Sequence, residues 1–107
     1  MDDRSDPDQA GLSPQERITR YLVLGGGGDP WRFLILPSAY RHRVGDDDMI
    51  HAVTHYLKLF DAGEGMTMVL GQASNAQLLE VGIVVWHGDL AIVHAMPART
   101  QFLSFLR

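Results

Sequence analysis

Histidine and arginine side chains cluster at two places in this sequence. Arg41, His42 and Arg43 stand together ahead of an apolar segment, and His94 and Arg99 lie near the C-terminus. An imidazole titrates near neutral pH and can move a proton, whereas a guanidinium presents a planar fork of donors that matches phosphate oxygens. These residue types predict acid–base chemistry beside a phosphate group. A solvated loop and a structural histidine are the plainer interpretations of the two clusters.

Glu80 is the one charged residue in the apolar run 78–86. A carboxylate in such a strand should face solvent, pair with an arginine, or act as a base. Arg99 and Arg43 are the candidate partners. Glu80 therefore joins His94 and Arg99 as a candidate catalytic residue.

His51 and His55 lie four residues apart, on one face of an expected helix. That spacing can hold a zinc ion. The zinc-protease pattern also requires a glutamate after the first histidine, where Ala52 stands, and no third ligand is evident. No metal or cofactor is therefore predicted. His51 can instead face a catalytic cleft, or both can be ordinary helix histidines.

Length and composition predict a single globular domain. The chain has 107 residues, of which 46% are hydrophobic and 21% charged, and it lacks cysteine. The net charge is −4, and residues 31–107 contribute only −1 of it. That balance disfavours a general nucleic-acid coat protein, but not an enzyme that grips a few phosphates. Without an apolar run near 20 residues or a visible signal peptide, we expect a cytoplasmic protein with no membrane contact.

The first 30 residues should be a poorly ordered segment that contains one short helix. Residues 1–12 are polar and acidic and predict disorder. Ser13 and Glu16 form a capping box for a helix over 14–23. Gly25–Gly28 predicts a linker, because no Lys-Ser/Thr pair follows it as in a phosphate-binding loop.

Residues 31–107 should form one α+β domain, with a helix on a three- to four-stranded antiparallel sheet. Apolar spacing and turn residues predict strands and helices in this order: strand 31–36, helix 47–60, strands 66–70, 78–86 and 90–95, and a short helix 100–106. The strand 78–86 should be central, and Gly82 suggests a bulge or a close approach. Ile92 and His94, two apart, should share a face.

The segment from Tyr40 to the C-terminus resembles the BrnT group of bacterial toxins, distant relatives of RelE-type ribonucleases. Three stretches carry the resemblance: 41–44 before an Asp-rich helix start, 68–81 with its hairpin, and 92–99. The last is similar to actinobacterial proteins that share a His-Ala-Met-Pro stretch. Met96 and His94 depart from the arginine and serine that the toxins often carry at these places, so the arginine function shifts to Arg99 or is missing.

The resemblance implies a RelE/BrnT-like fold and metal-independent cleavage of RNA. A base takes the proton of a ribose 2′-hydroxyl, an arginine stabilises the charge on phosphorus, and an acid protonates the leaving oxygen. It places His94 in acid–base catalysis, with His51 or Glu80 as the second group. Arg99, and Arg43 with its neighbours Arg41 and His42, would contact phosphate. The implied partner is a ribbon-helix-helix antitoxin.

Two other hypotheses remain beside the toxin ribonuclease. A non-catalytic protein-interaction module of the same fold fits the near-neutral charge and Met96. A metal-dependent enzyme would use His51 and His55.

Overall fold

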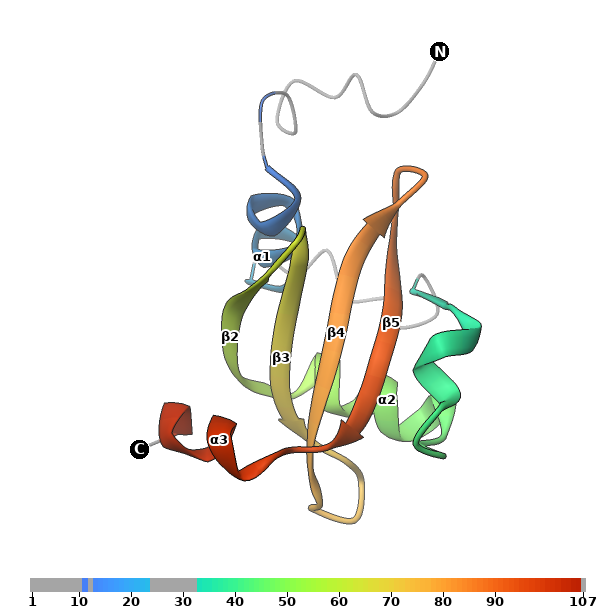
Figure 1. Cartoon of the computed structure of the whole chain (residues 1–107), viewed down its shortest axis with the longest axis vertical. Helices are drawn as coiled ribbons and strands as arrows, with labels where there is room; N and C mark the ends of the chain where they lie inside the picture. The colour runs from blue at the N-terminus through green and yellow to red at the C-terminus, as the bar shows by residue number, and fades with distance from the viewer. Residues whose placement is uncertain (1–10, 12, 24–32, 107) are drawn as a thin grey trace.

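The computed structural model describes residues 11, 13–23 and 33–106, and these form an α+β structure, as expected. Three helices and two short 3-10 turns accompany five strands (Figure 1). In chain order the elements are α1 (Pro14–Val23), β1 (Leu34–Ile35), η5 (Pro37–Tyr40), α2 (Asp46–Thr54), β2 (Tyr56–Gly63), β3 (Met66–Gln72), β4 (Leu78–Trp86), β5 (Asp89–Pro97), α3 (Thr100–Leu103) and η6 (Ser104–Leu106).

The sheet is five-stranded and mixed, so the prediction of three or four antiparallel strands was wrong. Its order is β1-β5-β4-β3-β2, with β4 central as expected. The four long strands run antiparallel to their neighbours, and short β1 pairs in parallel with β5. The long connection through α2 and β2 to β4 allows this pairing, because parallel strands need a crossover between them.

The fifth strand comes from residues that were expected to be helical. α2 ends at Thr54, and residues from Tyr56 onward form β2. The Thr54 hydroxyl donates to the Ile50 carbonyl oxygen at 2.9 Å, a back-bond typical of helix ends, and His55 leaves the helical region of φ/ψ space. A glycine-flanked turn with positive φ at 63–65 then returns the chain as β3.

Residues of the predicted helix 14–23 form α1, with the expected capping box. The Ser13 amide donates to Glu16 Oε1, and the Glu16 amide donates to Ser13 Oγ, both at 3.1 Å. Ile18 is fully buried, so α1 is packed into the core. The expectations for residues 1–10, the glycine run and Trp31 concern residues outside the described part of the chain.

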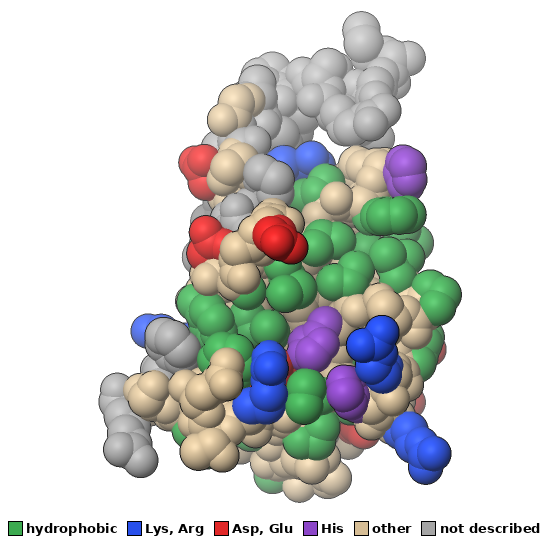
Figure 2. Space-filling model, in the orientation of Figure 1, with side chains coloured by type: hydrophobic (Ala, Val, Ile, Leu, Met, Phe, Trp, Pro, Cys, Tyr) green, Lys and Arg blue, Asp and Glu red, His purple; other side chains and the backbone are tan. Residues whose placement is uncertain are grey.

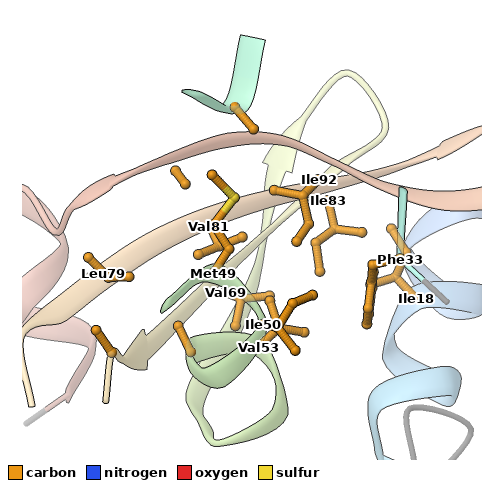
Figure 3. Packing of buried hydrophobic residues seen from close by; sticks show 14 residues of the cluster. Ile18, Phe33, Met49, Ile50, Val53, Val69, Leu79, Val81, Ile83 and Ile92 are labelled. Atoms are coloured by element: carbon orange, nitrogen blue, oxygen red, sulfur yellow. The ribbon is translucent and has the colours of Figure 1, made fainter. Parts of the chain in front are cut away.

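The main hydrophobic core lies between the sheet and the two longer helices. Figure 3 shows Met49 and Val53 of α2 near Val69 and Val81 of the sheet, with Ile18 at the other end of the cluster. All five are fully buried. The opposite sheet face, which carries Glu80, Gly82 and His94, faces the viewer in Figure 1, and we call it the open face.

A β-bulge in β5 decides which side chains reach the open face. Gly82 pairs with His94, whereas the next residue, Ile83, pairs with Ile92. Val93 is therefore the extra residue, and Ile92 and His94 point to opposite faces. The prediction that they share a face was wrong for this reason. The Ser38 hydroxyl donates to the Val93 carbonyl oxygen at 2.6 Å and anchors the bulge.

In the described part of the chain, no helix has the length and apolarity needed to cross a membrane.

Candidate active site

Glu80 is a fully buried carboxylate in the centre of the sheet. It lies on β4, paired with Leu70 of β3 and Met96 of β5. Its neighbours Leu79 and Val81 point into the main core, so Glu80 itself points to the open face. A charge without solvent is costly unless hydrogen bonds satisfy its oxygens. The arrangement around Glu80 supplies four of them.

Arg99 provides three of these bonds. Its Nε and Nη2 donate to Oε1 and Oε2 of Glu80 at 3.0 and 2.8 Å, and its backbone amide donates to Oε1 at 2.9 Å. The bidentate pairing fixes the plane of the carboxylate. Arg99 Cζ also lies 5.0 Å from the ring centroid of Phe102, which supports the guanidinium from the first turn of α3. Arg99 remains 46% exposed.

These contacts keep Glu80 ionised. Burial by itself would raise the pKa of Glu80, but the hydrogen bonds and charge of Arg99, with a further bond from His94, outweigh burial and lower the pKa below its ordinary value. Glu80 in turn raises the pKa of Arg99. Glu80 is therefore a fixed, acceptor-only group that orients its neighbours, and it is poorly placed to carry a proton itself.

His94 makes the fourth bond, with Nε2 2.9 Å from Glu80 Oε2. Because an ionised carboxylate only accepts, Nε2 must carry the hydrogen. In neutral His94 the lone pair is therefore on Nδ1, to which the described residues give no hydrogen bond. The side chain is 25% exposed. The site thus holds an oriented imidazole whose second nitrogen has no hydrogen bond from the described part of the chain.

His42 brings a second imidazole to the same place. Its ring centroid lies 6.0 Å from that of His94, with the rings nearly perpendicular. His42 and the flanking Arg41 and Arg43 are exposed. Arg43 has φ +63°, and its amide donates to the Tyr40 carbonyl oxygen at 3.0 Å, which closes the turn. In Figure 2, histidine and basic side chains gather at one end of the open face, beside an apolar surface.

His51 lies elsewhere. It belongs to α2, which packs on the other face of the sheet through Met49, Ala52 and Val53. His51 Nδ1 is 2.6 Å from the Gln72 carbonyl oxygen, and its ring stacks on that of His55. Of the predicted catalytic residues, the structure brings together His94, Arg99 and Glu80, while His51 stays apart.

Two contributors were missing from the sequence analysis. Ser38 holds the bulge that turns His94 outward, and Phe102 supports the Arg99 guanidinium. Neither has a signal in the sequence, because each acts through a contact between segments far apart in the chain. The prediction for His42 was also incomplete. It was expected to contact phosphate, but its proximity to His94 also makes it a candidate for proton transfer.

The comparisons with known proteins give this chain no relative. No family model matches it, and neither curated proteins nor solved structures contain a match. Within the described residues, no group of three or more histidine, aspartate or glutamate side chains is arranged to hold a metal ion.

Proposed function

We propose that this protein is the toxin of a bacterial toxin–antitoxin pair and cleaves RNA without a metal ion. The observation that carries the proposal is the His94 imidazole, which buried Glu80 orients through Nε2 and whose ring lies beside that of His42. No described residue makes a hydrogen bond to its Nδ1. The resemblance of residues 40–107 to BrnT toxins, within the RelE/BrnT-like fold group, supplies the substrate class.

The proposed reaction uses two imidazoles. His94 Nδ1 takes the proton of a ribose 2′-hydroxyl, and the oxygen attacks the adjacent phosphorus. The P–O5′ bond breaks while protonated His42 gives its proton to the leaving oxygen, so that a 2′,3′-cyclic phosphate and a 5′-hydroxyl result. Glu80 stabilises the His94 imidazolium that forms. His42 thereby replaces His51 and Glu80 as the second proton-transfer group.

Arginines would stabilise the negative charge on phosphorus. Arg99 uses Nε and Nη2 for Glu80, which leaves the donors of Nη1 for a ligand. Arg41 and Arg43 are exposed on the loop that carries His42. These guanidinium groups give the site its affinity for a phosphodiester although the domain is nearly neutral.

The proposed partner is a ribbon-helix-helix antitoxin that covers the open face, and the proposed location is the cytoplasm. An antitoxin in contact with His42 and His94 would exclude RNA from both imidazoles. A cognate gene beside this one would encode a short protein of that class.

Induction in a bacterial host tests the function directly. We expect growth arrest and cleaved transcripts with the wild type, and loss of both with His94→Ala or His42→Ala. Removal of a general acid or base costs about 100-fold or more in rate. His87→Ala is the matched control, because His87 is an exposed histidine on the β4–β5 turn. Equal arrest with His94→Ala and wild type would contradict the proposal.

A second candidate function is a non-catalytic protein-interaction module. The exposed apolar side chains of Leu34 and Trp86, at 42% and 45% exposure, favour it. This alternative predicts a stable complex with a partner protein and no RNA cleavage by the free protein. The mapped ends of cleaved transcripts separate the two functions.

A further inference from the structure

Gly82 leaves a gap in the open face beside His94. In the row across the strands it stands between Met68 of β3 and His94 of β5. The sequence predicted a bulge or a close approach at this glycine. The bulge lies opposite it, at Val93 of β5, and the close approach is made by the side chain of Met66. The glycine therefore makes room for Met66.

Met66 reaches Gly82 along a diagonal of the sheet. It is the first residue of β3 and, like Met68 two residues later, points to the open face. The next residue, Thr67, pairs with Ile83. Gly82 is therefore diagonally opposite Met66, a distance that a long side chain can span. A Cβ on Gly82 would stand 2.5 Å from Met66 Sδ and 3.3 Å from Met66 Cγ, so the thioether occupies the space that a side chain at position 82 would take.

The same space adjoins the base of the His94 side chain. A Cβ on Gly82 would also stand 3.2 Å from His94 Cβ, so the Met66 thioether and the His94 side chain border one small volume. A side chain turns about its first torsion angle among three staggered rotamers. Over a bare glycine the imidazole would be free to swing across β4 and away from Glu80. The thioether fills that place, which leaves the ring directed to Glu80 Oε2.

We propose that Met66, seated on Gly82, is a positioning residue for His94. Glu80 binds the imidazole, and Met66 blocks its swing over β4. The effect on turnover rests on the proposed ribonuclease function, in which the ring has to stay beside His42 for the two proton transfers. Met66 itself transfers no proton and contacts no substrate in this proposal.

Truncation of Met66 tests the positioning. Met66→Ala should lower kcat for RNA cleavage about tenfold at unchanged KM, because a displaced proton-transfer group slows the chemical step and leaves binding unaffected. In magnetic resonance spectra of the full-length protein without RNA, the His94 ring signals should move, and the Overhauser effect between the rings of His42 and His94 should weaken. Leu57→Ala, an apolar truncation at an exposed site on β2, should change neither the kinetics nor the spectra.

Gly82→Ala tests the shared space by filling it. The added methyl group would displace the flexible end of Met66 and press on His94, so kcat should fall and the His94 signals should move here too. In the double variant Gly82→Ala/Met66→Ala the methyl group fills the vacated place, so both readouts should lie closer to wild type than in either single variant. Gly45→Ala is the matched control, because a Cβ there meets nothing within 4 Å. Losses that simply add in the double variant would contradict the proposal.

The two readouts separate this proposal from the proposed function. If the wild type does not cleave RNA, the ribonuclease function fails, and the His94 signals of the same variants still decide whether Met66 holds the ring. Equal cleavage by wild type and Met66→Ala, with unmoved His94 signals, would overturn the positioning role and leave the ribonuclease function standing.

Discussion

At the scale of single residues, the buried carboxylate of Glu80 organises the candidate site. Arg99 and His94 each bind it, so one residue fixes both the guanidinium and the imidazole. A buried ion pair adds little net stability by itself, because removing two charges from water offsets their attraction. Removing one partner, however, leaves the other without its bonds. The three interacting side chains therefore fix the positions of Arg99 and His94 more than they stabilise the fold.

The pH dependence of stability should reveal the Glu80 interactions. The pKa of Glu80 is lower in the folded protein than in the unfolded chain, so the unfolded chain binds its proton first as pH falls. The contribution of Glu80 is complete above the ordinary glutamate pKa and is lost as pH falls through the folded pKa. Urea denaturation at several pH values should show this loss in the wild type, at most about 1.4 kcal/mol per pH unit.

Glu80→Gln is the comparison variant for that measurement. Glutamine keeps the shape of the side chain but cannot ionise. The free energy of unfolding of this variant should therefore fall less steeply with decreasing pH than that of the wild type. At pH 7 we expect it to be less stable by about 2 kcal/mol, because Arg99 loses a charged partner but remains in contact with water. Parallel pH profiles for the two proteins would show that Glu80 has no depressed pKa.

At the scale of elements, the contact between α2 and β3 depends on Gly71. A Cβ at this position would stand 2.0 Å from the Ala52 carbonyl oxygen, an overlap with backbone that no side-chain movement can relieve. Gly71→Ala should therefore push α2 from the sheet and lower the free energy of unfolding by about 3 kcal/mol. Urea denaturation measures the change.

Gly45→Ala is the matched control for Gly71→Ala. Gly45 precedes α2 with φ −77°, and a Cβ there would meet nothing within 4 Å. We expect a loss of about 1 kcal/mol or less at this N-cap position. If both variants lost the same small amount of stability, α2 and β3 would not approach as closely as described.

The elements that the sequence predicted are those defined by local signals. The capping box of α1 and the short connection between the strands predicted over 78–86 and 90–95 follow from neighbouring residues, and both are present. The end of α2 was missed because Tyr56 and Phe60 fit a helical period as well as a strand. The face of His94 was missed because a bulge depends on pairing with another strand. Most features of the candidate site that the sequence did not predict therefore depend on contacts between segments far apart in the chain.

At the scale of the whole molecule, the net charge of −4 does not describe the surroundings of His94. Arg99 shares the Glu80 carboxylate with His94, and Arg41 and Arg43 flank His42, whose ring lies beside that of His94. Local charge, rather than total charge, decides whether a phosphodiester is attracted to a site. A nearly neutral domain can therefore bind RNA at one end of one face, as the proposed function requires.

Substitutions in α1 can test whether this helix unfolds together with the sheet. Ile18 is fully buried against the sheet although it precedes the glycine run. Ile18→Ala should therefore destabilise the whole protein by about 3 kcal/mol, since it removes a core side chain and leaves a cavity. Thr19→Ala, at the exposed neighbouring position, should change stability by no more than about 0.5 kcal/mol. Hydrogen exchange should show α1 amides opening together with those of β4 in the wild type. Fast exchange confined to α1, with full stability in Ile18→Ala, would mean that the cooperative unit begins after the glycine run.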